Sequence, residues 1–152
     1  MPALDEHFRR TALLTKQDNF LLEQILERLE LAGDISHSQV SLYVRVGRAR
    51  KLMLAGQVRS RAGLSPQRDN VIGMTFSASE EPLVWRTIET GERIAGQREW
   101  ALGMEPLFME TFPVFAAKGN VIAALSFEMS GEETGTDHRI LLETVYMLLV
   151  SD

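Results

Sequence analysis

Two β-rich segments separated by a short polar turn constrain the fold of this chain more than any other feature. The first runs from Met109 to Ala117 and the second from Val121 to Met129, with Lys118-Gly119-Asn120 between them. A Gly-Asn pair between two such segments is typical of a tight β-hairpin. Pro113 has no N–H to donate, so we expect it at a sheet edge or at a non-donating site. The pattern predicts an antiparallel sheet.

A second pair of strands is predicted earlier in the chain. Residues 40–46 alternate apolar and other side chains, which is the period of a half-buried strand, and residues 52–58 repeat the pattern. Because only the short basic turn 47–50 joins them, we expect an antiparallel hairpin. Residues 71–76 are short and apolar, which fits either a strand or a buried turn. Residues 93–107 give no clear pattern.

Two amphipathic helices are predicted beside these strands. Thr15 and Asp18 have the spacing of a capping box at the start of the first, and Gly33 is its expected end. The second is expected to begin with Ser79 as its cap and to end at Gly91.

A third helix is predicted from about Thr136, with apolar side chains at near-heptad spacing. No glycine follows its last residues, which is typical of a helix that continues in a longer chain. The order helix, strand pair, helix, strand pair, helix predicts an α+β domain: one central antiparallel sheet with helices packed on it, and amphipathic helices near both ends of the chain.

Composition narrows the function classes. The length of 152 residues and the 45% hydrophobic content fit one globular domain, and the net charge of -5 argues against nucleic acid or an acidic membrane as a partner. No apolar segment reaches the roughly 20 residues of a membrane span, and the first ten residues are too charged for a signal peptide. We therefore expect a cytoplasmic protein with no membrane contact.

No catalytic or metal site is predicted. The chain has no cysteine, which excludes disulfides, zinc–thiolate sites, iron–sulfur clusters and thioether-linked chromophores. The histidines His7, His37 and His138 are far apart in the sequence, so surface positions are favoured over a metal or haem role. Glu80 and Glu81 are explained by the preference of a helix N-terminus for anions. We expect no enzyme activity from this chain.

Four segments give the chain a resemblance to the GAF domain at the N-terminus of PdtaS-type bacterial sensor histidine kinases. They are Leu31-Ala32-Gly33-Asp34-Ile35-Ser36, Asp69 to Gly73, Glu80-Glu81-Pro82-Leu83-Val84 through Glu89-Thr90-Gly91, and Phe112-Pro113-Val114 through Gly119-Asn120-Val121-Ile122-Ala123-Ala124-Leu125. Each segment marks the beginning or end of a helix or strand and is not specific by itself. The resemblance lies in the order and spacing of the four segments over about residues 20–130.

The resemblance implies a GAF-like (PAS-related) sensor domain over residues 15–130, after an N-terminal extension, residues 1–14, with a weak helical pattern. Residues 131–152 would be a linker and a C-terminal signalling helix. The implied function is a sensory input domain of a two-component sensor histidine kinase, acting as a homodimer on downstream kinase domains and, through them, on a response regulator. The chain has no glycine-rich phosphate loop between a strand and a helix. The Asn-Lys-x-Phe-Asp signature of cyclic-nucleotide-binding relatives is absent, so no cofactor or ligand is assigned.

The resemblance also implies a small-molecule pocket on one face of the sheet, beneath the mid-chain helix. The predicted ligand contacts are the aromatic and soft side chains of those segments: Tyr43, Met74, Phe76, Trp85, Trp100, Phe108 and Phe112. Trp100 lies in an irregular segment, so it is expected to line or cover a cavity.

The last helix is predicted to carry the signal, by pairing with its copy in a second chain. The dimer-signalling residues are Ile140, Leu141, Val145 and Leu148. A small change at the pocket would then rotate or re-register the helix pair. The alternative is a GAF-shaped dimerisation module without a small-molecule ligand. A stand-alone enzyme is disfavoured because no nucleophile–base pair is evident.

The charge distribution leaves two interpretations open. No acidic residue lies between Asp34 and Asp69, a window that contains Arg45, Arg48, Arg50, Lys51, Arg59, Arg61 and Arg68. This basic window is either a face that meets an anion, an acidic partner surface or, least favoured, nucleic acid, or a solvated hairpin protected by charge against edge-to-edge pairing. Residues 99–137 are acidic in contrast, so complementary surfaces in a dimer or a multidomain kinase are a further hypothesis.

Overall fold

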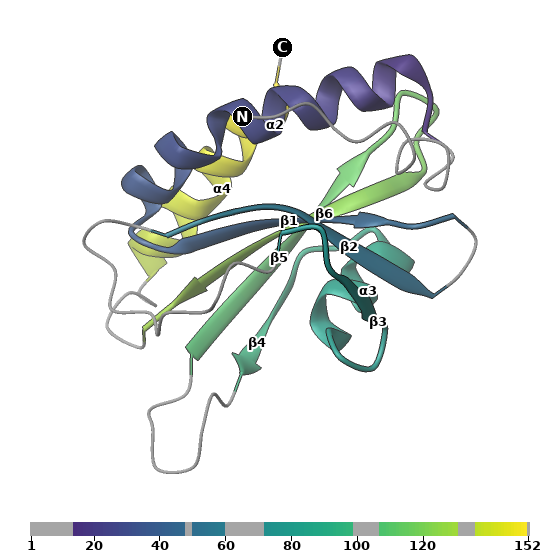
Figure 1. Ribbon diagram of the computed structural model, residues 1–152. Coiled ribbons are helices and arrows are strands. Elements are labelled where there is room, and N and C mark those ends of the chain that lie inside the picture. The colour runs from purple at the N-terminus through teal and green to yellow at the C-terminus, as the bar shows by residue number, and fades with distance from the viewer. Residues whose placement is uncertain (1–13, 48–49, 60–71, 99–106, 131–135, 152) are drawn as a thin grey trace.

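The computed structural model describes residues 14–47, 50–59, 72–98, 107–130 and 136–151, and these form a six-stranded antiparallel sheet with helices on both faces (Figure 1). The strands are β1 (Gln39–Arg45), β2 (Lys51–Val58), β3 (Thr75–Ser77), β4 (Ile94–Arg98), β5 (Leu107–Phe115) and β6 (Val121–Met129). Their spatial order is β3-β2-β1-β6-β5-β4. The predicted α+β architecture is confirmed.

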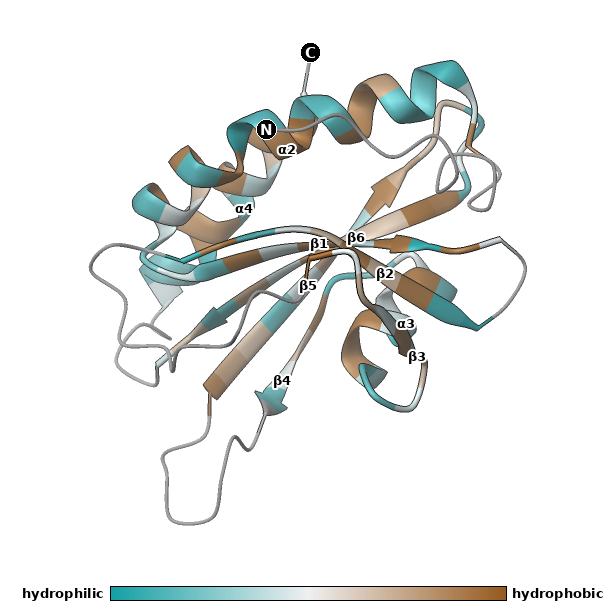
Figure 2. Ribbon diagram, in the orientation of Figure 1, coloured by the Kyte–Doolittle hydropathy of each residue, from teal (hydrophilic) through white to brown (hydrophobic). Residues whose placement is uncertain are grey.

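Helices α2 (Lys16–Ser36) and α4 (Thr136–Val150) cover one face of the sheet, and α3 (Pro82–Thr90) covers part of the other (Figure 1). Figure 2 shows brown hydrophobic segments both in the helices and in the strands that they cover, and these residues form one core cluster on each face of the sheet. Because β1 lies in the middle of the sheet with a hydrophobic cluster on each face, it is buried along nearly its whole length. The prediction of a half-buried strand is wrong at β1 for this reason.

Helix α2 begins as predicted and ends later. The backbone N–H of Asp18 donates to Oγ1 of Thr15 at 3.1 Å, and the N–H of Thr15 donates back to the Asp18 carboxylate at 3.1 Å. The helix then passes through Gly33 and ends at Ser36, with His37 in the left-handed conformation at φ 53°. Gly33 is a packing position, since a Cβ there would lie 3.1 Å from Cγ2 of Val58 in β2.

Helix α3 begins later than predicted and ends at Gly91 as expected. Its N-cap is Glu81, not Ser79, because a separate turn precedes the helix. In that turn the N–H of Ser77 donates to the Glu80 carboxylate at 2.9 Å, and the N–H of Glu80 donates to Oγ of Ser77 at 3.3 Å. Hydrogen bonds from the backbone N–H and the side chain of Ser77 to the Glu80 carboxylate hold the pKa of Glu80 below its usual value.

Both predicted hairpins are present. In the β5–β6 connection the N–H of Ala116 donates to the carbonyl of Asn120 at 2.7 Å. β4 pairs with β5 only as far as Thr111, so at Pro113 β5 has a described neighbour on one side only. The free carbonyl of Pro113 accepts a 2.6 Å hydrogen bond from the hydroxyl of Tyr146 in α4.

The β1–β2 hairpin contains a bulge at Ala55, where the partners change from Leu42–Gly56 to Tyr43–Leu54. The extra residue moves the side chains on either side of it to opposite faces of the sheet. Residues Leu52 and Leu54 therefore pack beneath α3, whereas Val58 packs beneath α2. The sequence left either a strand or a buried turn open for residues 71–76. This segment contains the start of β3, which pairs with β2.

Side chains of α2 bind the end of α4. Arg28 donates to the carbonyl oxygens of Leu148 and Ser151 at 2.9 and 2.7 Å, and Gln24 donates to that of Ser151 at 2.9 Å. They satisfy carbonyl groups that the last turn of a helix leaves without an intrahelical partner. No helix among the described residues is both long enough and apolar enough to cross a membrane.

Candidate ligand pocket

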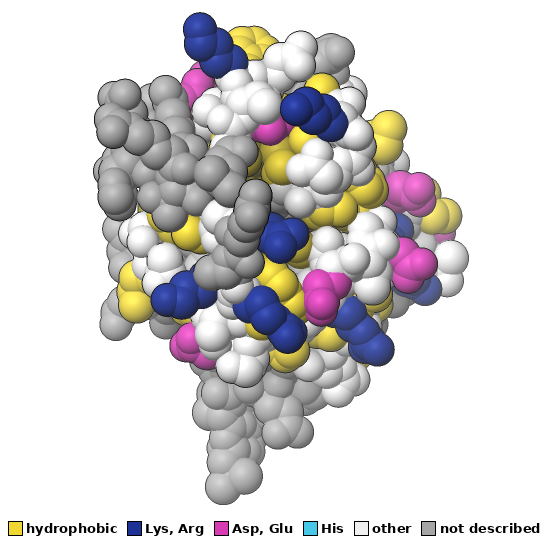
Figure 3. Space-filling view, turned by 90° about the vertical axis from the view of Figure 1, so that its right-hand side faces the viewer, with side chains coloured by type: hydrophobic (Ala, Val, Ile, Leu, Met, Phe, Trp, Pro, Cys, Tyr) yellow, Lys and Arg dark blue, Asp and Glu magenta, His cyan; other side chains and the backbone are white. Residues whose placement is uncertain are grey.

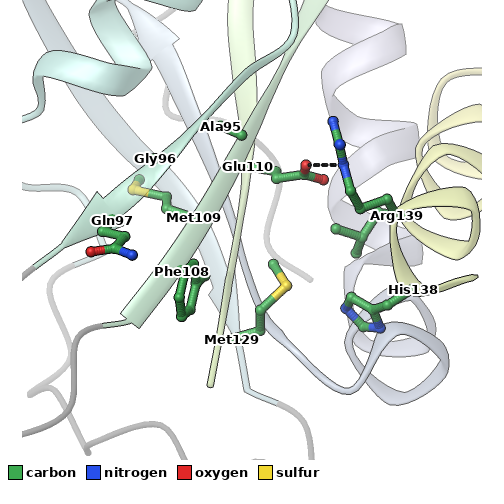
Figure 4. A pocket seen from close by; sticks show the side chains of 10 residues that line it. Ala95, Gly96, Gln97, Phe108, Met109, Glu110, Met129, His138 and Arg139 are labelled. Atoms are coloured by element: carbon green, nitrogen blue, oxygen red, sulfur yellow. Dashed lines mark hydrogen bonds and ion pairs between the residues drawn. The ribbon is translucent and has the colours of Figure 1, made fainter. Parts of the chain in front are cut away.

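A cavity of about 440 Å³ lies between the first turns of α4 and the β4–β5–β6 part of the sheet (Figure 4). This volume is within the range of small-molecule sites. The lining residues are Ala95, Gly96 and Gln97 of β4, Phe108, Met109 and Glu110 of β5, Met129 of β6, and His138, Arg139 and Leu142 of α4. We call it the α4 cavity.

Paired residues of neighbouring strands form the walls of this cavity. Phe108 and Met129 are directly paired across β5 and β6 and form an apolar wall with Leu142. Ala95 is paired with Glu110 across β4 and β5. The small side chain of Ala95 leaves space at the sheet edge, and the cavity has apolar walls with a few polar groups at its rim, as ligand sites commonly have.

Glu110 holds the cavity side of the sheet to α4. Only 6% of this residue is exposed, and its carboxylate accepts from Arg93 at 2.5 Å and from Nε of Arg139 at 3.1 Å. Figure 4 shows the second of these bonds at one side of the cavity. A buried carboxylate requires such partners, because an unpaired buried charge is strongly destabilising.

Arg93 extends this network. The same guanidinium donates to the backbone carbonyl of Arg139 at 3.2 Å and lies 4.4 Å from the centroid of the Phe112 ring. It also lies 3.8 Å from Glu143, which is largely exposed. Residues from β5, the segment before β4 and the first turns of α4 thus meet at one polar cluster.

The predicted ligand residues divide between the two faces of the sheet. Tyr43, Phe76 and Trp85 lie on the α3 face, where Tyr43 and Phe76 make an edge-to-face contact with centroids 6.1 Å apart. Tyr43 and Trp85 are buried in a core cluster with Leu52, Leu54, Val84, Ile88, Met109 and Ala124. Met74, just before β3, is exposed.

The remaining predicted ligand residues are elsewhere. Phe108 and Phe112 are four positions apart in β5 and therefore share a face of the sheet. Both pack with the cluster beneath α2 and α4, which is on the face opposite α3. Phe108 lines the α4 cavity, whereas Phe112 stacks on Tyr146 with centroids 4.8 Å apart. Trp100 lies outside the described residues. A ligand contact for each of the seven stays a prediction.

The predicted dimer-signalling residues divide between exposed and buried positions of α4. Ile140 and Leu148 are exposed, Leu141 is half-buried, and Val145 is fully buried in the core beneath α2 and α4. Met147, which the sequence prediction omitted, is exposed beside Leu148. The outward stripe of α4 is therefore Ile140, Met147 and Leu148.

Sequence reasoning missed the residues of the polar cluster. Glu110 lies between Phe108 and Phe112 at positions that share a face, so an acid in the middle of an apolar strand was the available signal. Its partners Arg93 and Arg139 are distant in sequence and carried no such signal. Within the described residues, no group of three or more metal-ligating side chains is close enough to hold a metal ion.

Solved structures share this fold at low sequence identity. The sensor region of a sensor histidine kinase aligns with a TM-score of 0.67 and 18% identity, over 98% of this chain and 52% of that chain. The chain thus spans about half the length of that sensor region. An IclR transcriptional regulator from Alicyclobacillus acidocaldarius aligns with a TM-score of 0.62 and 12% identity, over 94% of this chain and 68% of that chain. The IclR structure from Thermotoga maritima aligns with a TM-score of 0.58 and 10% identity, over 95% of this chain and 70% of that chain.

These identities show a common fold and no more. No curated protein matches the chain. The family model for the GAF domain of the histidine kinase PdtaS matches residues 4–146, which is nearly the whole chain. The GAF-like fold and the family resemblance are both confirmed, and the chain belongs to the family of PdtaS histidine kinase GAF domains.

Proposed function

We propose that this chain is the sensory input domain of a two-component sensor histidine kinase, and that it binds a small molecule in the α4 cavity. The observation that carries the proposal is the double role of α4. Its first turns form a wall of the cavity through His138 and Leu142, and its outward stripe presents Ile140 and Leu148 to solvent. A ligand that moves this helix would change the position of the exposed apolar side chains on its outward stripe.

The Glu110 cluster supplies the mechanical connection in this proposal. Arg139 is next to His138 in the cavity wall and is bonded to Glu110 in the sheet. A ligand that contacts His138 or displaces Arg139 would shift the first turn of α4 relative to β5. Differential contacts of this kind are what a ligand needs to shift a conformational equilibrium.

The second part of the proposal is a homodimer formed through α2 and α4. The exposed apolar residues Leu31, Met147 and Leu148 lie on this helix pair, beside a groove of about 330 Å³ lined in part by Ala32, Ile35 and Val145. A second copy offers the same side chains and the same groove, as a two-fold interface requires. Two antiparallel helix pairs would then form a four-helix bundle.

In the parent protein, this domain would act in the cytoplasm on downstream kinase domains and so on a response regulator. Phosphoryl transfer would belong to those domains. The support for a non-catalytic role is that no nucleophile–base pair is evident in the sequence.

A metabolite screen by thermal unfolding tests the proposal, because a ligand that binds only the folded state raises the unfolding midpoint. Ala95 is exposed at the cavity and is not part of the core, so Ala95→Phe is expected to fill the cavity and leave the fold intact. Compounds that stabilise the natural protein should fail to stabilise this variant. Ala95→Ser, which leaves the cavity open, is the matched control. A compound that stabilises all three proteins equally would exclude the α4 cavity as its site.

A dimerisation module without a ligand is the second candidate function. The packing on the α3 face favours this candidate, because Tyr43, Trp85 and Met109 are buried there as core residues of one hydrophobic cluster. If a broad screen finds no stabilising compound and the chain still forms a dimer, this second candidate is the better description.

A further inference from the structure

Two arginines of the β1–β2 connection lie over one tryptophan of α3. The period of two places Arg45, the last residue of β1, on the same face as Tyr43, which is the α3 face, and Arg50 lies directly before β2. The Cζ atom of each arginine is 5.5 Å from the centroid of the Trp85 ring. Cation–π attraction to Trp85 accounts for part of this arrangement.

No acidic side chain among the described residues neutralises these two positive charges. Within the part of the chain that the structure describes, neither Arg45 nor Arg50 lies within 4.0 Å of a carboxylate oxygen. Glu81, the buried acid of this face, instead accepts a hydrogen bond from Tyr43. Two like charges that lie close together repel each other, so this pair, without a counter-charge among the described residues, requires an explanation.

Two buried donors at the same place have no acceptor within the described part of the chain. They are Nε of Arg45 and Nε1 of Trp85, and the tryptophan is only 5% exposed. Both groups can only donate, so they cannot satisfy each other. Buried polar groups are nearly always hydrogen-bonded, which makes two unpaired donors beside two free guanidinium groups unusual.

Protection of a sheet edge does not explain these charges. β1 is an interior strand between β2 and β6, and β3 covers β2 at Lys51–Met53, next to Arg50. The edge interpretation of the basic window therefore fails at Arg45 and Arg50. Figure 3, which views the molecule from the side of the β1–β2 connection, shows several Lys and Arg side chains near the middle of that surface, with hydrophobic atoms and Asp or Glu side chains among them.

We propose that Arg45, Arg50 and Nε1 of Trp85 form a binding site for an oxyanion, that is, a phosphate or carboxylate group. Guanidinium groups match the geometry of such groups, and an anion would supply both the missing counter-charge and the missing acceptors. The site is on the α3 face, opposite the α4 cavity, so the proposal does not depend on a ligand in that cavity.

The indole N–H resonance of Trp85 in a proton–nitrogen NMR spectrum is a direct probe, assigned as the signal lost in Trp85→Phe. Sodium phosphate, sulfate and acetate are titrated separately at constant ionic strength, with sodium chloride as the balancing salt. The proposal expects this signal to move and saturate with at least one oxyanion. Saturation by phosphate and sulfate alone indicates a tetrahedral group, and saturation by acetate indicates a carboxylate. No saturable shift with any of the three overturns the proposal.

Charge variants separate a site from general attraction. Arg45→Gln and Arg50→Gln are each expected to weaken the saturable binding about tenfold, the effect of losing one charge-assisted hydrogen bond. Lys51→Gln removes the same charge from the same connection, but its side chain points to the other face of β2, so binding should stay within about twofold. An equal loss in all three variants would show attraction to net charge only and would also overturn the proposal.

Discussion

Leu83 of α3 lies directly against the backbone of Gly96 in β4, where a Cβ atom would be 2.7 Å from Cδ1 of the leucine. We predict that Gly96→Ala lowers the free energy of unfolding by about 1 kcal/mol, because Leu83 must move aside in a packed region. Urea unfolding measures this. In a Leu83→Ala background the same glycine substitution should cost almost nothing, and an unchanged cost there would mean that the strand, not the contact, requires glycine.

The hydrogen bond from Tyr146 to the carbonyl of Pro113 gives a prediction on pH. Burial raises the pKa of Tyr146 above its usual value of 10.0. The folded protein therefore keeps this proton at a pH where the unfolded chain loses it. The stabilisation is complete below pH 10 and is lost as the pH rises through the folded pKa.

Tyr146→Phe should cost about 1 kcal/mol at pH 8, since it removes one hydrogen bond from an otherwise similar ring. The variant should also lack this tyrosine's contribution to the loss of stability above pH 10. Urea unfolding of both proteins at several values between pH 8 and 11 checks this. Parallel pH curves for the two proteins would contradict the assignment.

Removing the charge of the buried Glu110 should lower the free energy of unfolding more than removing the charge of the exposed Glu143. Glu110→Gln removes the charge that Arg93 and Arg139 share, and we expect a loss of about 2 kcal/mol. This is below the usual cost for a buried pair, because Arg139 is 61% exposed and solvent screens it. Glu143→Gln is the control. Glu143 is 68% exposed and 3.8 Å from Arg93, so its loss should change the free energy of unfolding by less than about 0.5 kcal/mol.

The proposed dimer surface can be tested with one charge. Leu148 is 53% exposed, so Leu148→Glu should leave the fold intact and convert a dimer into a monomer in sedimentation equilibrium. Met74→Glu places the same charge at a residue of similar exposure (52%) just before β3, away from α4, and should leave the dimer unchanged. A natural chain that is monomeric at high concentration would contradict the dimer itself.

Features set by neighbouring residues could be predicted from the sequence. The capping box of Thr15 and the β5–β6 hairpin depend on residues a few positions apart, and both are present. The end of α2 could not be predicted in the same way. A glycine that ends a helix and a glycine that lets a helix approach a strand look the same in one sequence, and Gly33 is of the second kind.

Features set by distant residues could not be predicted. β4 gave no strand signal because its centre must be small beneath Leu83, so the position carries glycine in place of a β-branched residue. The burial of β1 on both faces follows from the strand order, which one sequence does not state. The Glu110 cluster joins residues 17 and 29 positions apart, and the cavity beside it arises only when they meet.

Helix α4 is bound at both ends, to Glu110 of the sheet at its first turn and to Arg28 of α2 at its last. Sliding along its own axis would break both attachments together, whereas turning about that axis could keep one of them. If α4 relays a signal as proposed, these two attachments favour torsion over sliding, and a stimulus at one end of the helix would arrive at the other as a change of orientation instead of a change of length.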